Sequence, residues 1–163
     1  MTKLKAGPHR RPALQAGAST AARRAEAIRY IESSALVAAI LEGDAAAKAS
    51  MRAQGQRITS ALTVAETSRA VLRAQLSGRI TVRQQQAALL TLRTFARRCH
   101  IMSITEAILA EAACRFPVEP VRTLDAIHLA SAAAVGEPPA LVTIVTRDVR
   151  VRDNAIALGH PVE

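Results

Sequence analysis

Four acidic residues stand out by where they fall in the sequence. Glu32 directly follows a short β-prone run, and Asp148 comes three residues after a β-branched run. Glu66 and Asp125 lie inside stretches that are otherwise apolar and helical in pattern, and a carboxylate in such surroundings needs a partner. In open α/β sheets, ligands bind at the carboxyl ends of the strands, so the positions of Glu32 and Asp148 predict a site there.

Convergence of these carboxylates would create a cation site. Each close pair of carboxylates repels by roughly 4 kcal/mol at about 4 Å and an effective dielectric of about 20, and a divalent cation relieves that repulsion. Oxygen ligands without a His or Cys partner suit Mg²⁺ or Mn²⁺. Such an ion activates water and neutralises charge on a phosphate, so the predicted reaction is metal-assisted hydrolysis of a phosphodiester bond. No protein nucleophile is required.

Two of these acidic residues and one neighbouring histidine also have ordinary structural explanations. Asp125 can stabilise its own helix N-terminus, with Thr123 as the cap and about 0.3–1 kcal/mol from the helix dipole. Glu66 can form a surface ion pair with Arg69, which follows it by three positions. His128, one helical turn beyond Asp125, is expected to be a packed or hydrogen-bonded residue rather than a base.

Other chemistries are disfavoured. Ser33 and Ser34 have no nearby His that would make one of them a nucleophile, and the GxxxxGK[ST] phosphate-binding loop is absent from the sequence. The two cysteines, Cys99 and Cys114, lack the number of a disulfide framework and the spacing of a zinc site. We expect them to be reduced thiols of a cytoplasmic protein. Apolar runs are all far shorter than the roughly 20 residues that span a bilayer, so no transmembrane segment is predicted.

The positive charge is concentrated at the start of the chain. The 163 residues carry a formal net charge of +9 at pH 7, and residues 1–29 contain seven basic residues and one acidic residue. Residues 1–27 are predicted to be a basic, disordered extension; a nucleic-acid-binding arm and an over-long translation start are the alternatives. Residues 28–163 are predicted to form a single domain.

Strand and helix signals alternate along that domain. This alternation predicts a three-layer α/β/α fold with a mostly parallel central sheet. The β-prone runs are residues 27–31, 57–59, 100–104 and 141–145. The helical patterns are residues 35–41, 44–54, 60–78, 82–98, 105–116, 123–135 and 149–158.

Substrate binding is expected to rest on charge rather than on stacking. Only 2% of the residues are aromatic, too few for the base-stacking platforms of many single-strand binders. Arginines near the acidic residues can instead grip phosphates, and the candidates are Arg69, Arg73, Arg147 and Arg150. Ordinary solvated helix faces are the alternative explanation for these side chains.

Four segments together resemble the acidic motifs of PIN-domain ribonucleases. They are residues 30–37 (YIESSALV), 62–66 (LTVAE), 122–130 (RTLDAIHLA) and 145–148 (VTRD), in the order and spacing of that family. The TLDAIHLA block is specific, whereas each of the others is weak alone. Within the superfamily, the chain most resembles the toxin component of VapBC-type toxin–antitoxin pairs, from about Ile28 to its last residue.

The resemblance implies an activity, a cofactor and partners. Proteins of this kind are Mg²⁺- or Mn²⁺-dependent endoribonucleases, usually homodimeric, and a small cognate antitoxin silences them. Carried over by position, Glu32 and Asp125 would be the principal metal ligands. Glu66 and Asp148 would complete the acidic cluster, and Ser34 would hydrogen-bond near the first carboxylate.

The first acidic position departs from the family pattern. It is commonly Asp, and here it is Glu32. The extra methylene moves the carboxylate by about one carbon–carbon bond, whereas Mg²⁺ requires near-ideal octahedral contacts. Because a flexible rotamer or an intervening water can compensate, we expect an active enzyme. The alternative is a catalytically silent PIN-like module that binds RNA or a protein.

Overall fold

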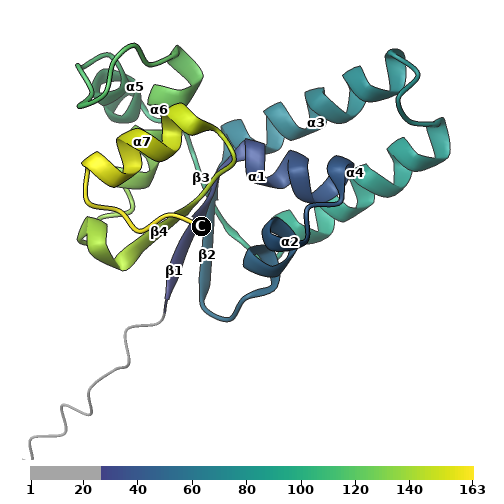
Figure 1. Ribbon diagram of the computed structural model, residues 1–163, viewed down its shortest axis with the longest axis horizontal. Coiled ribbons are helices and arrows are strands. Elements are labelled where there is room, and N and C mark those ends of the chain that lie inside the picture. Colours follow the sequence, from purple (N-terminus) through teal and green to yellow (C-terminus); the bar gives the residue numbers. More distant parts are fainter. Residues whose placement is uncertain (1–26) are drawn as a thin grey trace, which may run out of the picture.

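A four-stranded sheet forms the centre of the computed structural model, which describes residues 27–163 (Figure 1). The order across the sheet is β3-β2-β1-β4, and all neighbouring strands are parallel. The expected mostly parallel sheet is therefore confirmed. The strands are β1 (Ile28–Ile31), β2 (Gln56–Ser60), β3 (His100–Met102) and β4 (Val142–Val145).

Helices cover both faces of the sheet and divide by their position in the chain, as the colours of Figure 1 show. This arrangement confirms the predicted three-layer α/β/α architecture. On one side lie α1 (Ser33–Val37), its π-helical continuation η1 (Ala38–Glu42), α2 (Ala45–Arg52), α3 (Ala61–Leu76) and α4 (Val82–Ala96). On the other side lie α5 (Glu106–Ala112), α6 (Thr123–Ala133) and α7 (Val149–Ala157); a short 3₁₀ turn, η2 (Pro139–Leu141), leads into β4.

The predicted extension, residues 1–27, lies outside the described residues except for Ala27. None of the helices in the described part of the chain is both long enough and apolar enough to cross a membrane.

Alternation along β1 sends neighbouring side chains into two separate cores, because successive residues of a strand point to opposite faces. Tyr30 packs with Leu129 of α6, whereas Ile31 packs with Leu36 of α1. Glu32 has extended backbone angles (φ −87°, ψ 160°), so it continues the alternation on the Tyr30 side. The strand thereby aims the first acidic residue at the α6 side of the sheet.

Helix α6 is the most enclosed helix near the first acidic residue. Every residue from Ala126 to Ala132 is buried, and the helix contacts both α5 and α7. A helix that is apolar on nearly all sides packs in the interior rather than at the surface. Its first turn, which carries Asp125, is therefore held rigidly at the edge of the core.

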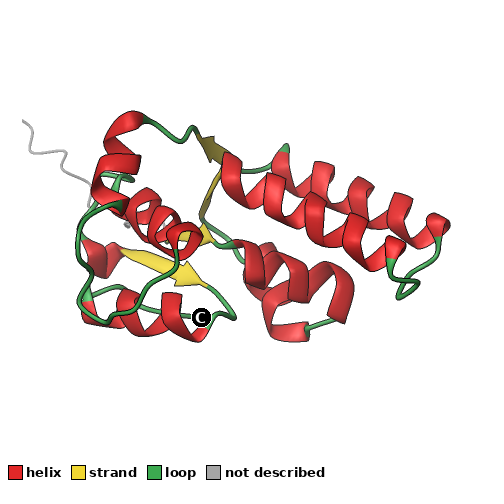
Figure 2. Cartoon of the chain, turned by 90° about the horizontal axis from the view of Figure 1, so that it is seen from above, coloured by secondary structure: helices red, strands yellow, loops and turns green. Residues whose placement is uncertain are grey.

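Helices α3 and α4 form an antiparallel pair that extends away from the sheet (Figure 2). Ser60 caps α3 by accepting a hydrogen bond from the Thr63 backbone N–H at 3.3 Å. Thr81 and Gln84 form a capping box at the start of α4. These caps fix the point at which α3 leaves the sheet, and Glu66 lies in the second turn after that point.

Helix α5 is shorter than predicted. The pattern indicated a helix to Phe116, but α5 ends at Ala112. Pro117 follows Phe116, and a residue before proline is disfavoured in helical conformation. The segment after α5 therefore runs as a loop toward α6.

Gly55 allows the close approach of the chain that starts β2. Its φ is +116°, and a Cβ at this position would lie 2.2 Å from the backbone oxygen of Ala27. That oxygen accepts a hydrogen bond from Gln56 N at 3.0 Å. Only glycine fits here without displacing the pairing of β1 with β2.

Candidate active site

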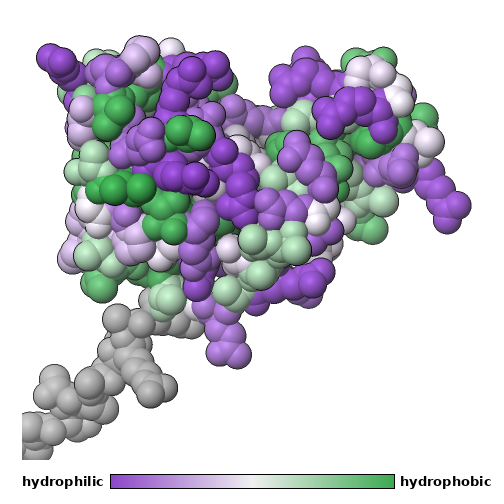
Figure 3. All heavy atoms as spheres, viewed as in Figure 1, coloured by the Kyte–Doolittle hydropathy of each residue, from purple (hydrophilic) through white to green (hydrophobic). Residues whose placement is uncertain are grey.

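All four predicted acidic residues line one open cleft of about 290 Å³. Glu32 and Asp148 follow the carboxyl ends of the adjacent strands β1 and β4, Glu66 comes from α3, and Asp125 comes from α6. The cleft therefore lies where the two groups of helices meet, and Figure 3 shows hydrophilic residues running between these two groups on the face in view. The fold brings the four carboxyl groups together from segments far apart in the sequence.

Glu32 is the N-cap of α1 and is held by a dense set of donors. The backbone N–H of Ser34 donates to both carboxylate oxygens, at 3.0 Å each. The Ser33 hydroxyl donates to Oε1 at 2.6 Å, and the Thr146 hydroxyl donates to Oε2 at 2.9 Å. The Ser34 hydroxyl also donates to Oε2. These bonds give both oxygens of a buried carboxylate hydrogen-bond donors and fix its orientation.

Ser34 connects this carboxylate to the loop after β4. Its hydroxyl oxygen accepts hydrogen bonds from the backbone N–H groups of Arg147, at 2.7 Å, and Asp148, at 3.0 Å. Asp148 in turn caps α7, since its Oδ1 accepts from Arg150 N at 2.8 Å. One serine thus sets the spacing between the first and the fourth acidic residue.

Asp125 lacks such support. It lies in the first turn of α6, where the N-cap residue Arg122 makes no side-chain capping bond, so the expected Thr123 cap is absent. Oδ2 of Asp125 is buried and has no hydrogen-bond partner among the described residues. Burial, followed by the charge of Asp148, raises the pKa of Asp125. An unpartnered carboxylate oxygen beside other carboxylates is the kind of ligand that a divalent cation such as Mg²⁺ prefers. The acidic residues of the cleft therefore fit a divalent cation.

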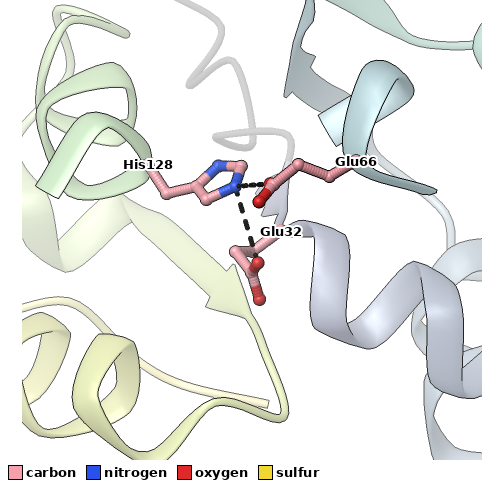
Figure 4. A group of neighbouring side chains, drawn as sticks. All are labelled: Glu32, Glu66 and His128. Carbon is pink, nitrogen blue, oxygen red and sulfur yellow. Dashed lines mark hydrogen bonds and ion pairs between the residues drawn. The ribbon is translucent and has the colours of Figure 1, made fainter. Parts of the chain in front are cut away.

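Glu66 forms a different ion pair from the one that its sequence suggested. Its Oε2 lies 2.7 Å from Nε2 of His128, and the pairing with Arg69 is not formed (Figure 4). Although burial acts to raise the pKa of Glu66, the hydrogen bond from His128 holds it below its ordinary value. His128 is buried and hydrogen-bonded, as its sequence context favoured.

Glu32, Glu66 and His128 also form a compact group of possible ligands. Each offers one atom, and these three atoms lie within 4.8 Å of one another. His128 Nε2 is 3.6 Å from Oε1 of Glu32, which is too long for a hydrogen bond (Figure 4). His128 was not predicted from the sequence to belong to the site, although its position three residues after Asp125 puts both on one helix face.

Three further residues of the site were missed from the sequence. Thr146 bonds Glu32, Tyr30 bonds His128, and Arg122 lines the cleft. Each adjoins or lies within a motif, but nothing in the residue types alone marks them.

The phosphate-binding expectation for Arg147 is not supported by its contacts. Its Nε donates to Oδ2 of Asp44 at 2.8 Å, and its Nη1 donates to the backbone oxygens of Thr146 and Glu163. The hydrogen bond from Arg147 lowers the pKa of Asp44 to about 2. Arg147 therefore ties the loop after β4 to the start of α2.

A larger cavity, of about 660 Å³, lies between α2 and α4 and is separate from the acidic cleft. Its charged lining residues are the bases Lys48, Arg52, Arg57 and Arg98, and none of its lining residues is acidic. It therefore has no group that could act as a hard-metal ligand or a general base of the predicted kind.

The parallel α/β domain thus gathers four carboxyl groups in one cleft beside the carboxyl ends of β1 and β4, which is the arrangement expected of a metal-dependent hydrolase. The chain belongs to the PIN-domain family, whose sequence pattern matches residues 29–157.

Individual proteins that are similar to this chain include VapC and VapBC proteins. It is 37% identical over 134 residues to Ribonuclease VapC35 of Mycobacterium tuberculosis strain H37Rv, covering 80% of this chain and 91% of that protein. The crystal structure of Mycobacterium tuberculosis VapC20, a sarcin-ricin loop cleaving toxin, superposes with a TM-score of 0.58 at 18% identity, covering 81% of this chain and 95% of that one. VapBC2 from Rickettsia felis, bound to a promoter DNA fragment, superposes with a TM-score of 0.58 at 15% identity, covering 83% of this chain and 97% of that one.

Proposed function

We propose that the protein is a metal-dependent endoribonuclease that hydrolyses RNA phosphodiester bonds and acts as the toxin of a type II toxin–antitoxin pair. The observation that carries the proposal is the convergence of four carboxyl groups on one cleft, with a buried and unpartnered oxygen on Asp125. The similarity of the chain to Ribonuclease VapC35, at 37% identity, supports RNA as the substrate.

Glu32 and Asp125 would hold Mg²⁺ or Mn²⁺, and Glu66 and Asp148 would complete the acidic cluster. When bound, the ion supplies an activated water and neutralises charge that develops on the phosphate. The chain's own residues provide the orientation. Hydroxyl and amide donors fix Glu32, α6 fixes Asp125 at the edge of the core, and Ser34 sets the distance to Asp148.

RNA would be held through its phosphates. Arg122 is exposed and lines the acidic cleft, so it is placed to contact the phosphate next to the cleaved bond. Arg69, Arg73 and Arg150 are exposed and remain candidates for contacts further along the strand. Binding of this kind weakens steeply as salt rises.

We propose a small cognate antitoxin and a second copy of the chain as protein partners, in the cytoplasm. The Rickettsia felis structure with the same fold is a VapBC assembly, which supports a toxin–antitoxin pairing for this chain. An antitoxin that covers the acidic cleft would silence the enzyme by excluding RNA.

The deciding experiment is RNA cleavage by the purified protein with Mg²⁺, with Mn²⁺ and with EDTA. We expect products with either ion and none with EDTA, and Asp125→Asn should abolish cleavage while the protein stays folded. Equal cleavage by Asp125→Asn and the unaltered protein would refute the proposed site.

The alternative expected from Glu32, a catalytically silent module that binds RNA or a protein, is not favoured, because similar proteins are named ribonucleases. Glu32→Asp separates the two, because it shortens the side chain and keeps the charge. For an active enzyme we expect cleavage to stay the same or fall. A large gain of cleavage in Glu32→Asp would favour the silent module.

A further inference from the structure

Tyr30 and His128 form a buried pair behind the acidic cleft, and the function proposed above assigns them no role. Tyr30 is fully buried in β1, and His128 is 2% exposed in α6. The Tyr30 hydroxyl lies 3.1 Å from Nδ1 of His128, and the rings meet edge to face with centroids 6.3 Å apart. On its other side, the His128 ring faces Glu66 and Glu32 (Figure 4).

Hydrogen-bond chemistry determines which nitrogen of His128 carries the hydrogen that faces the acids. The Tyr30 hydroxyl carries a proton, as tyrosine hydroxyls ordinarily do near neutral pH, and it lies within hydrogen-bond distance of Nδ1, so it can donate to that nitrogen. A neutral imidazole has one donor and one acceptor nitrogen, so Nε2 is then the donor. The other neutral tautomer would set an Nε2 lone pair 2.7 Å from a Glu66 oxygen. A doubly protonated ring donates from both nitrogens, so Nε2 is a donor in every compatible state.

We propose that Tyr30 and His128 are positioning residues: Tyr30 fixes the His128 ring, and Nε2–H of His128 holds the Glu66 carboxylate in the orientation in which it completes the acidic cluster around the metal ion. His128 is therefore not a metal ligand, although its Nε2 lies within reach of Glu32 and Glu66. The inference rests on the proposed function, because it concerns the same metal site.

Glu66 reaches the acidic cluster from the far side of the cleft. It comes from α3, which belongs to the opposite helix group from α6, and its side chain is 25% exposed. The bond from His128 joins this partly exposed side chain to the buried first half of α6. Residues that hydrogen-bond a metal ligand from behind typically change metal affinity about 10–100-fold when they are replaced.

The test is Mn²⁺ binding to the full chain, measured by titration calorimetry without RNA. His128→Asn and His128→Gln are a matched pair. The Gln amide nitrogen can reach the position of Nε2, whereas the Asn amide ends near Nδ1. We expect His128→Asn to weaken Mn²⁺ binding about 10–100-fold, His128→Gln to stay within about threefold of the unaltered protein, and Tyr30→Phe to fall between them.

His160 provides the control for loss of a buried histidine. It is 6% exposed, its Nδ1 lies 3.0 Å from the backbone oxygen of Val142, and it is not among the residues that line the acidic cleft. His160→Gln should bind Mn²⁺ as the unaltered protein does. Melting curves without metal identify any variant that fails to fold, and Tyr30→Phe, which removes one oxygen, remains as the mildest test.

Cleavage assays add a second readout that a purely structural role would not move. In His128→Asn the Mn²⁺ concentration for half-maximal cleavage should rise, while KM for RNA at saturating Mn²⁺ stays the same. If the unaltered protein binds no Mn²⁺, the proposed function fails and this inference fails with it. If the unaltered protein, His128→Asn and Tyr30→Phe all bind Mn²⁺ equally, only the positioning role is refuted. Equal loss in His128→Gln and His128→Asn would instead make His128 a direct ligand.

Discussion

Glu32 and Asp125 line the same cleft, yet their carboxylates differ in the hydrogen bonds that they accept. Glu32 is 3% exposed and accepts hydrogen bonds from Ser33, Ser34 and Thr146. Asp125 has a buried oxygen that finds no partner within residues 27–163, and its pKa is raised by burial and by the charge of Asp148. Within the described residues, the β1 corner of the cleft, Glu32 with its donors, has partners for both carboxylate oxygens, whereas the α6 corner, Asp125, has an oxygen that a bound cation could satisfy.

This difference separates two tasks within one site. Bonds to Glu32 contribute to folding, because they cap α1 and tie it to the loop after β4. The unsatisfied oxygen of Asp125 contributes nothing to folding and costs some stability. A carboxylate with an unsatisfied oxygen is suited to binding a cation. The comparison therefore predicts that substitutions of Asp125 harm catalysis and that substitutions of Glu32 harm stability.

The largest expected effect is on cleavage in Asp125→Asn. The amide keeps the shape and removes the charge, so metal-dependent RNA cleavage should fall by about 10²–10³-fold, the equivalent of several kcal/mol of charge stabilisation. The melting temperature without metal should stay the same or rise, since an uncompensated charge is removed. A clear drop in that melting temperature would show that Asp125 is structural, and the comparison with Glu32 would fail.

The next largest effect is on the stability of Glu32→Ala. This change removes an N-cap and leaves the buried donors of Ser34 and Thr146 without their acceptor, so the free energy of unfolding should fall by about 2–3 kcal/mol. Urea denaturation without metal measures it. Asp125→Ala is the matched control, and we expect a much smaller loss there. Similar losses in both variants would remove the distinction between the two corners.

A smaller effect concerns pH. Because the pKa of Asp125 is raised in the folded state, the folded protein keeps a proton that the unfolded chain has already lost. Stability without metal should therefore decrease as pH rises from the ordinary Asp pKa, about 3.9, through the raised value. Urea denaturation of the unaltered protein and of Asp125→Asn, measured from pH 3.5 to 7, isolates this contribution. A stability difference that is constant over the range, or that changes in the opposite direction, contradicts it.

The smallest effect is expected at the Asp44–Arg147 ion pair, which flanks the β1 corner. Its bond lowers the pKa of Asp44 to about 2, so its contribution is present above the ordinary Asp pKa and is lost as pH falls toward 2. Asp44→Asn should reduce the melting temperature slightly at pH 7 and low salt, and the reduction should vanish at high salt. A reduction that persists in 1 M salt would indicate that the helix cap of α2, rather than the ion pair, is responsible.

The fold was predictable because its signals are local. The β-branched run before Asp148 and the apolar block after Asp125 identify a buried strand and a buried helix without reference to the rest of the chain. The end of α5 was predicted four residues too late, because the apolar pattern continues to Phe116 while Pro117 opposes a helix there.

The partners of the site residues were less predictable. Glu66 has an arginine at the right helical spacing, and yet it pairs with His128, which lies 62 residues away. Arg147 has the charge to bind a phosphate, but Asp44 occupies it. Spacing reveals which neighbours a helix offers, but the packing of α3 against the α6 side of the molecule decides which of them is reached.

The sequence by itself determined the four acidic positions, the parallel α/β architecture and the family, because residue order and periodicity carry that information directly. Only the tertiary structure decided which carboxylate is held and which is left open. That outcome depends on partners that are distant in the sequence: Thr146, just after β4, donates to Glu32 from 114 residues away, and His128 of α6 contacts Glu66 from 62 residues away. Hydrogen bonds act over about 3 Å, so their pattern exists only once the chain has folded.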